Sequence, residues 1–344
     1  MDLSKIRKDE KDCIPVVLAS DGNYAKYLAT TIQSIIVNIS DTNQYEIIVF
    51  DGGISEEDKQ KITGMIHEIK NVIIRFVLVE EKIKNIDFSQ FKMPRRYITH
   101  VTYFQLFIPR ILSMYKKCVY LDCDLVVNCD IAELYKQELD ECCLAAVLDY
   151  GMNKSVLAKD PDRCEYVFET LKLKDSNSYF NSGVLVMNLE QMRHNRFEER
   201  ALRMLNPDKL LLHNDQSILN AVCNGSVKYL NYSYNFHWCF GKNMKSTFPK
   251  EMQPFFDQPK IIHYIGALKP WTYKTNSLAD YFWKYARQTP FFDEIKKEYE
   301  PYLKKHQKEN LKNYRKYRWK SVLALDLNKR WRTKRDRYFQ LCHY

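Results

Sequence analysis

Short apolar runs alternate with segments of helical periodicity along the first part of the chain. The β-branched run Ile14 to Ser20 precedes the turn formers Asp21 to Tyr24, and further runs occupy Tyr45 to Phe50 and Val72 to Val79. Apolar residues at three- and four-residue spacing predict a helix after each of the first two runs, and Ser55 is placed to cap the second helix. Strands that alternate with helices are typical of a parallel sheet, in which ligands bind beyond the carboxyl ends of the strands.

The same pattern continues through the middle of the chain. The segment Tyr97 to Arg110 predicts a helix, and Val119 to Val127 predicts a central strand. Further apolar runs predict strands at Cys142 to Leu148 and at Asn181 to Leu189, and the stretch Ile261 to Trp271 is predicted to join a short strand to a loop. Polar residues collect at the ends of these elements, which is where a binding site is expected.

Two carboxylates, Asp122 and Asp124, interrupt the predicted central strand. Charged groups are costly to bury without a compensating ion, and where a strand breaks into a turn both carboxylates can reach one metal. Hard oxygen ligands with open positions suit Mg²⁺ or Mn²⁺ that also binds phosphates. The alternative is a surface turn with solvated carboxylates, because Asp-x-Asp alone is a weak signal.

Polar residues also follow the first predicted strand. Asp21 and Asn23 can form hydrogen bonds to the edge of a base or to a ribose, and Tyr24 can stack on a base. This part of the chain lacks the Gly-x-Gly-x-x-Gly turn of dinucleotide-binding proteins and the Gly-Lys-Ser/Thr loop of NTPases, so phosphates must be held in another way. A capped helix start explains the same residues equally well.

Two further stretches carry candidate chemistry. His263 lies in a predicted strand, Gly266 after it permits close approach of the backbone to a ligand, and Lys269 can bind phosphate. A lone histidine is more often structural than metal binding. Asp215 begins a predicted helix, where it can also be a simple N-cap.

The composition limits the class of protein. The 344 residues, 45% of them hydrophobic, suffice for one large α/β domain with an appendage or for two domains. No apolar stretch approaches the about 18 residues that cross a bilayer, and no signal-peptide pattern opens the chain, so we expect a cytoplasmic protein. The formal net charge is +10, and residues 303–344 hold 8 Lys and 6 Arg against 3 acidic residues. The whole basic excess therefore lies in this C-terminal segment.

Apolar residues in the basic segment are spaced as in an amphipathic helix. Trp319, Leu323, Leu327 and Trp331 recur every four residues, with Val322 beside them. Such a helix suits the surface of an anionic membrane, where each nearby basic residue contributes about 1 kcal/mol. We therefore expect a peripheral protein on the inner face of the cell membrane that does not bind nucleic acid. A solvated basic face and a nucleic-acid-binding patch are the alternatives.

Five ordered motifs between about Ile14 and Trp271 resemble those of the family 8 glycosyltransferases, which are retaining enzymes, in particular of the bacterial α-1,4-galactosyltransferase type. The motifs are Ala19-Ser20-Asp21-Gly22-Asn23-Tyr24, Tyr120-Leu121-Asp122-Cys123-Asp124, Tyr179-Phe180-Asn181-Ser182-Gly183-Val184, Asn214-Asp215-Gln216 and His263-Tyr264-x-Gly266-x-x-Lys269-Pro270-Trp271. The resemblance implies an α/β fold of GT-A type, with a Rossmann-like mixed sheet and flanking helices, over residues 1–275. A small basic helical region that associates with the membrane is expected over residues 276–344.

The resemblance also implies an activity and its residues. It implies transfer of galactose or glucose from UDP-galactose or UDP-glucose to a glycan or glycolipid acceptor such as the core of lipooligosaccharide or lipopolysaccharide. Mn²⁺, with Mg²⁺ as an alternative, is expected at Asp122, Asp124 and His263. The implied donor-binding positions are Ala19, Asp21, Asn23 and Tyr24 for the uridine side, Asp122 and Cys123, Asn181 for the sugar, and Gly266 and Lys269 for the diphosphate. The implied catalytic positions are Gln216, Asp149 and Asp215.

One position departs from the family pattern. Many members have Tyr-x-Arg-Leu where this chain has Tyr103-Phe104-Gln105-Leu106, so a cation expected near the donor site is missing. Gln105 can donate a hydrogen bond but supplies no charge. Two other classes of function remain as alternatives, a nucleotidyltransferase and a noncatalytic, membrane-associated protein that binds a sugar nucleotide. The first should carry a Gly-rich basic loop after the first strand, and the loop here is acidic.

Overall fold

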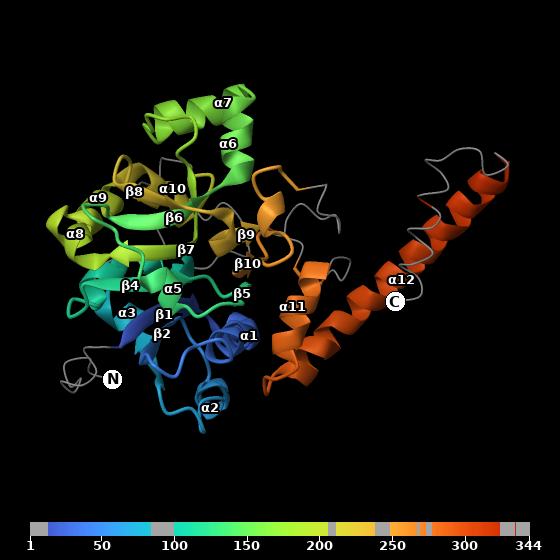
Figure 1. Ribbon diagram of the computed structural model, residues 1–344, viewed down its shortest axis with the longest axis horizontal. Helices are drawn as coiled ribbons and strands as arrows, with labels where there is room; N and C mark the ends of the chain where they lie inside the picture. The colour runs from blue at the N-terminus through green and yellow to red at the C-terminus, as the bar shows by residue number, and fades with distance from the viewer. Residues whose placement is uncertain are drawn as a thin grey trace.

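The centre of the molecule is a seven-stranded sheet in the order β3-β2-β1-β4-β7-β6-β8 (Figure 1). The computed structural model describes residues 13–83, 100–205, 211–237, 248–266, 269–272, 277–323 and 334. The strands are β1 Ile14–Ser20, β2 Tyr45–Asp51, β3 Val72–Leu78, β4 Lys117–Leu121, β6 Leu144–Leu148, β7 Phe180–Asn188 and β8 Val227–Leu230. Strand β7 is antiparallel to both of its neighbours, and the other pairs are parallel. The sheet is therefore mixed, as a GT-A type fold requires.

A second, smaller sheet lies beside the first and has the order β5-β10-β9. Its strands are β5 Leu125–Val127, β9 Phe236–His237 and β10 Ile261–His263. Strand β10 pairs antiparallel with β5 and parallel with β9, so that His263 lies opposite Leu125 on one side and His237 on the other. Strand β10 of this sheet therefore places His263 near the end of β4.

Helices cover both faces of the large sheet. The described helical segments are η3 Gly22–Tyr24, α1 Ala25–Ile36, α2 Glu56–Gly64, α3 Val79–Lys82, η5 His100–Phe107, α4 Ile108–Ile111, α5 Ala132–Tyr135, α6 Tyr150–Leu157, α7 Pro161–Cys164, η6 Glu165–Thr170, α8 Leu189–His194, α9 Phe197–Met204, α10 Asn214–Val222, η7 Tyr232–Asn235, η9 Gln253–Phe255, α11 Ser277–Ala286 and α12 Phe292–Leu323. Among these, α2 begins as its sequence predicts, because the Ser55 hydroxyl accepts a hydrogen bond from the Asp58 amide at 3.1 Å.

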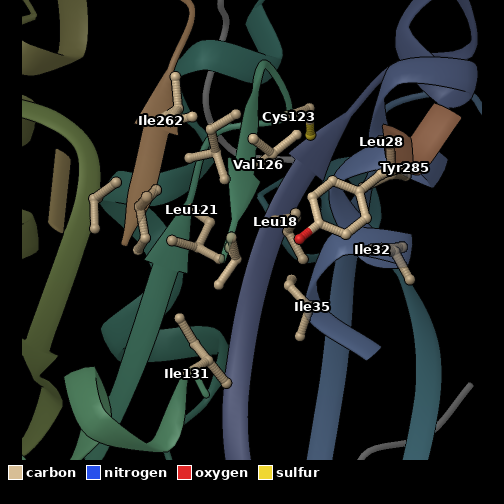
Figure 2. Close-up of a cluster of buried hydrophobic side chains, with 14 of the residues drawn as sticks. Leu18, Leu28, Ile32, Ile35, Leu121, Cys123, Val126, Ile131, Ile262 and Tyr285 are labelled. Carbon is tan, nitrogen blue, oxygen red and sulfur yellow. The ribbon is translucent and has the colours of Figure 1, made fainter. Parts of the chain in front are cut away.

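Two hydrophobic cores lie on opposite faces of the sheet. Side chains alternate along a strand, so Val16 and Leu18 of β1 lie in the first core and Val17 lies in the second. Figure 2 shows part of the first core, where Leu28 and Ile32 of α1 lie near Leu18 and where both sheets contribute side chains. Strands buried on both faces explain why the central runs are continuously apolar.

Several predicted boundaries are wrong. The run Val119 to Val127 is not one strand, because the chain turns at Asp122 to Asp124 and β5 joins the smaller sheet. The segment predicted as one helix from Tyr97 is divided, in its described part, into the 3₁₀ helix η5 and the short helix α4, which begins at Ile108 and has Pro109 in its first turn. Proline suits a first turn because its missing N–H has no partner there.

Other boundaries differ by one or two residues. The third strand ends at Leu78 rather than at Val79, where α3 begins, and β6 begins at Leu144 rather than at Cys142. The alternative that Asp215 is an N-cap is also wrong, because His213 is the N-cap residue of α10.

Helix α12 begins on the body of the protein and then extends away from it (Figure 1). Phe291, Ile295 and Tyr299 are buried in the first core, and Lys26 of α1 forms an ion pair with Glu294 at 3.0 Å and a second with Glu298. No helix in the described ranges combines the length and apolar character needed to cross a membrane. The predicted stripe Trp319, Val322, Leu323, Leu327 and Trp331 lies outside the described side chains.

Candidate active site

A cavity of about 390 Å³ opens where β1 and β4 end. Its described lining contains many polar side chains from segments that are far apart in the sequence. The lining residues are Ala19, Ser20, Asp21, Tyr24, Val101, Thr102, Gln105, Tyr120, Asp122, Cys123, Asp124, Asn181, Ser182, Leu212, His213, Asn214, Asp215, Gln216, His263, Ile265 and Gly266. The volume lies within the usual range for a small-molecule site.

Asp122, Asp124 and His263 form a cluster in the wall of this cavity. One ligand atom from each lies within 4.8 Å of the other two. The His263 Nε2 atom is 3.0 Å from Asp124 Oδ1 and 3.5 Å from Asp122 Oδ2. Two carboxylates and an imidazole are a donor set that suits a divalent metal such as Mn²⁺.

Backbone and side-chain contacts position both carboxylates. The Asp122 amide donates a hydrogen bond to the Gly183 carbonyl at 2.8 Å, and the Tyr120 hydroxyl donates to Asp122 Oδ1 at 3.0 Å. Lys269 donates to Asp124 Oδ2 and, at 2.7 Å, to the Tyr264 carbonyl. The turn between β4 and β5 is therefore anchored from β7 and from the loop after β10.

Gly183 on β7 lies directly against the cluster. A Cβ atom at this position would be 2.1 Å from His263 Cε1 and 2.6 Å from Asp122 Oδ2. Both distances are far below van der Waals contact, so only glycine leaves room for the side chains of His263 and Asp122.

A chain of amide side chains extends from His263 into the interior. His263 Nδ1 is 3.0 Å from Asn235 Oδ1, and Asn235 Nδ2 donates to Asn181 Oδ1 at 2.8 Å. Asn181 Nδ2 then donates to Gln216 Oε1 at 3.0 Å, and Gln216 Nε2 donates to Asp149 Oδ2 at 3.2 Å. The chain connects the cluster of Asp122, Asp124 and His263 with Asp149, which is the N-cap of α6.

Backbone donors fix the orientation of these amides. The Gly183 N–H donates to Asn181 Oδ1 at 3.0 Å, and the Ser182 N–H donates to Gln216 Oε1 at 3.1 Å. Because a backbone N–H can only donate, both side-chain oxygens must face it. Asn235 then presents its oxygen to His263, whose Nδ1 must carry the proton and whose Nε2 faces the carboxylates.

Asp215 and Gln105 form a second buried polar group at the cavity. Asp215 Oδ2 accepts hydrogen bonds from the Gln105 side-chain amide and, at 3.2 Å, from the Ser182 hydroxyl. Burial and the Asp122 charge raise the pKa of Asp215 well above its ordinary value, because both disfavour the charged form. The position where a cation was expected from the family pattern is thus occupied by a neutral donor.

Aromatic side chains lie next to the cavity at the first βα loop. Asp21 caps η3 by accepting a hydrogen bond from the Tyr24 amide at 3.1 Å. Tyr27 stacks on Trp271 with the ring centroids 3.9 Å apart, and Tyr24 makes edge contacts with both rings. The Cys123 thiol donates to the Ala19 carbonyl at 3.1 Å, which joins the loop to the carboxylate turn.

The pKa values of the two carboxylates in the cluster shift in opposite directions. Burial and the Asp124 carboxylate raise the pKa of Asp122 above its ordinary value, although His263 opposes this. Burial also opposes ionisation of Asp124, but Lys269 and His263 outweigh it and lower its pKa. Burial and the Asp124 charge raise the pKa of Tyr24, so its hydroxyl stays neutral.

The sequence model of glycosyl transferase family 8 matches residues 15–275. The chain belongs to glycosyl transferase family 8. It is 26% identical over 280 residues to General stress protein A of Bacillus subtilis (strain 168), a match that covers 78% of this chain and 91% of that protein. It is 27% identical over 292 residues to a lipopolysaccharide 1,2-glucosyltransferase of Escherichia coli, covering 82% of this chain and 80% of that protein.

Two solved structures have similar folds. The galactosyltransferase LgtC in complex with donor and acceptor sugar analogs aligns with a TM-score of 0.65 and 25% identity, covering 80% of this chain and 96% of that chain. The bifunctional glycosyltransferase WbbM aligns with a TM-score of 0.75 and 28% identity, covering 85% of this chain and 53% of that chain. The GT-A type fold predicted for this family 8 member is therefore confirmed.

Most residues predicted for the site of a family 8 enzyme line this one cavity. Asn23, Asp149 and Lys269 are not in the described lining: Asn23 is exposed on η3, Lys269 reaches the site through Asp124, and Asp149 reaches it through Gln216. The roles of all these residues remain predictions.

Sequence reasoning missed two contributions to the site. Asn235 holds His263, yet nothing in the sequence connects two residues that lie 28 positions apart. Gly183 is part of a family motif, but its close approach to His263 depends on strand pairing that the sequence does not reveal.

Proposed function

We propose that the protein is a retaining hexosyltransferase that transfers galactose or glucose from a UDP-sugar to a glycan acceptor. Its similarity to a lipopolysaccharide glucosyltransferase supports an acceptor such as the core of lipooligosaccharide or lipopolysaccharide. The observation that carries the proposal is the cluster of Asp122, Asp124 and His263 in the wall of a cavity beyond β1 and β4.

The residues of the cluster suit a resident Mn²⁺, with Mg²⁺ as the weaker alternative. Because Nδ1 of His263 donates to Asn235, Nε2 is the ring nitrogen that remains to bind a metal. An imidazole favours Mn²⁺ over Mg²⁺. When bound, the metal would supply a Lewis acid that stabilises the negative charge of the departing UDP.

We assign the donor to the two sides of the cavity. The first βα loop, with Asp21, Asn23 and Tyr24, would hold the uridine next to Ala19 and Cys123. Gly266 has a φ of +78°, a conformation that allows its backbone to approach the diphosphate closely. Lys269 beside Asp124 would add positive charge at the diphosphate.

The donor sugar would lie against the buried amide and carboxyl groups. Asn181, Asp215 and Gln216 are the proposed contacts, and their oxygens would stabilise positive charge at the anomeric carbon. Gln216 Oε1 already accepts two hydrogen bonds, from Asn181 and from the Ser182 amide, which leaves it little capacity to act as a nucleophile. Attack by the acceptor on the face that the phosphate leaves is therefore the mechanism of retention that we favour.

An assay of purified protein with a panel of UDP-sugars tests the proposal. We expect Mn²⁺-dependent release of UDP from UDP-galactose or UDP-glucose, faster with a suitable acceptor than by hydrolysis alone. Binding of UDP-sugar without any turnover would instead support the noncatalytic alternative. Membership of a glycosyltransferase family speaks against a nucleotidyltransferase.

We further propose that residues 276–344 hold the enzyme at an anionic membrane surface. The observation that favours this is helix α12, which is anchored near Ile295 and then extends from the body with exposed basic residues such as Lys304, Lys312 and Arg315. Helix α11 packs in the first core, so the part that stands apart begins within α12. A peripheral location would bring the catalytic domain, residues 1–275, to a lipid-linked acceptor.

A further inference from the structure

The first turns of α12 contact α1 through charged side chains. The Tyr27 hydroxyl donates a hydrogen bond to Glu298 Oε2 at 3.0 Å. Lys26, the residue before Tyr27, forms one ion pair with Glu298 and another with Glu294 at 3.0 Å. The Lys26 side chain is 12% exposed and Tyr27 is 6% exposed, and a hydrogen bond to a charged acceptor is stronger than one between neutral groups. Glu298 thus joins α12 to two successive side chains of α1.

The ring of Tyr27 connects this contact with the cavity. It stacks on Trp271 with the ring centroids 3.9 Å apart and an interplanar angle of 15°. Tyr24 lies edge-on to both rings, at 5.2 Å from Tyr27 and 6.4 Å from Trp271. Tyr24 lines the cavity and is 37% exposed, whereas Tyr27 and Trp271 are buried and are not in the described lining. The two buried rings therefore form a support behind the ring that a ligand can reach.

The support depends on a part of the chain that the family model does not cover. The model ends at residue 275, whereas α11 begins at Ser277 and α12 at Phe292. Phe282 of α11 packs on Trp271 with the centroids 5.0 Å apart, and Glu298 of α12 holds Tyr27. Residues outside the matched region thus fix the aromatic side of the site.

We propose that Glu298 is a positioning residue for nucleotide binding: through Tyr27, it holds the ring of Tyr24 in the orientation that stacks on the base of a UDP-sugar. The inference rests on the proposed function, because it assumes that the uridine lies at the first βα loop. A side chain that is already ordered loses less conformational freedom on binding, so the support raises affinity without touching the ligand. Among the described contacts, Glu298 binds α1 and no residue proposed for the metal or the sugar.

The experiment compares the binding of a ligand that has a base with that of one that has none. Calorimetric titration with UDP and with inorganic pyrophosphate, each in the presence of Mn²⁺, gives the two affinities. Complete loss of a base–aromatic stack weakens binding by about 5- to 150-fold. In Glu298→Ala we therefore expect the Kd of UDP and the KM of the UDP-sugar to rise by about 5- to 20-fold. The affinity for pyrophosphate and kcat should both stay within about 2-fold of the wild type, because neither depends on the base.

Three matched variants test whether the effect passes through Tyr27. Tyr27→Phe keeps the stacked ring but removes the hydroxyl, so it should reproduce most of the loss seen in Glu298→Ala. The double variant should bind UDP about as well as Glu298→Ala, because both changes break the same contact. Glu298→Gln keeps an acceptor for the hydroxyl and should retain UDP affinity to within about 3-fold. Glu300→Ala, which removes an exposed carboxylate of the same helix, should behave like the wild type.

The outcomes distinguish the two levels of the proposal. If the wild type binds no UDP, the proposed function fails and this inference fails with it. If the wild type binds UDP and both Glu298→Ala and Tyr27→Phe bind it equally well, the inference alone is overturned. Equal losses for UDP and pyrophosphate, or a lower kcat at an unchanged KM, would also overturn it, because Glu298 would then only support the fold. If Glu298→Ala does not fold, Tyr27→Phe decides, since it leaves the ion pairs of α12 in place.

Discussion

Replacing Gly183 by alanine introduces one methyl group into the wall of the proposed metal site. The new Cβ would lie 2.1 Å from His263 Cε1, 2.6 Å from Asp122 Oδ2 and 2.8 Å from His263 Nδ1. Ordinary contacts begin at 3.4 Å, so the His263 ring must move by more than about 1 Å. The ring cannot move alone, because Asn235 holds its other nitrogen.

The size of the effect follows from that displacement. Overpacking a buried site costs about 1–3 kcal/mol of folding free energy. A misplacement of about 1 Å in a catalytic arrangement costs on the order of 10²-fold in rate. We therefore expect Gly183→Ala to fold with reduced stability, to bind Mn²⁺ weakly and to lose about 100-fold or more in kcat.

Calorimetric titration with Mn²⁺ and thermal unfolding with and without Mn²⁺ measure both effects. Gly64→Ala is a matched control, because a Cβ there would meet nothing within 4 Å. It should bind Mn²⁺ and turn over like the wild type. Wild-type Mn²⁺ affinity and turnover in Gly183→Ala would refute the assignment of the cluster as the metal site.

Three further predictions test the site and the C-terminal region. Asp122→Ala and Asp124→Ala should each abolish transfer and metal-dependent UDP binding in a UDP-release assay, and near wild-type turnover in Mn²⁺ would contradict the metal assignment. His263→Ala should weaken the binding of Mn²⁺ and of UDP together. The wild-type enzyme should be more active with Mn²⁺ than with Mg²⁺. Equal wild-type rates with both metals, or in the presence of EDTA, would show that His263 is not part of the site. Deletion from about Lys312 onward should abolish binding to anionic liposomes in a sedimentation assay. UDP-sugar hydrolysis should stay largely intact, because the buried start of α12 is retained. Unchanged liposome binding would contradict the membrane proposal.

The local sequence pattern predicts individual strands well, but it predicts the pairing of distant strands poorly. The run Ile14 to Ser20 is a strand from end to end, since an apolar run bounded by turn formers has no competing interpretation. The direction of β7 was not predictable, because apolar runs carry no information on strand direction. The two carboxylates at Asp122 and Asp124 can be recognised in the sequence as a candidate metal site. That β5 belongs to the smaller sheet cannot be predicted locally, because it depends on pairing with Ile261–His263.

The site divides in the same way. Residues with distinctive chemistry, such as Asp124 and His263, could be selected from the sequence and do lie together. Residues that act by position could not be selected: Asn235 is an ordinary buried amide until its contact with His263 is known. Gln105 stood out only as a departure, and its unpaired carbonyl is visible only in three dimensions.

The amide chain from His263 to Asp149 has a single polarity. Each amide directs its oxygen toward His263 and its nitrogen toward Asp149, and none of the three amides can change its protonation state. Aligned hydrogen bonds polarise one another, so the acceptor at the Asp149 end makes the imidazole at the other end a stronger electron donor. His263 and Asp149 are thus coupled electronically through fixed hydrogen bonds, without a conformational change. A hydroxyl group that donated a hydrogen bond to Asp149 would therefore weaken the polarisation of every hydrogen bond between Gln216 and His263.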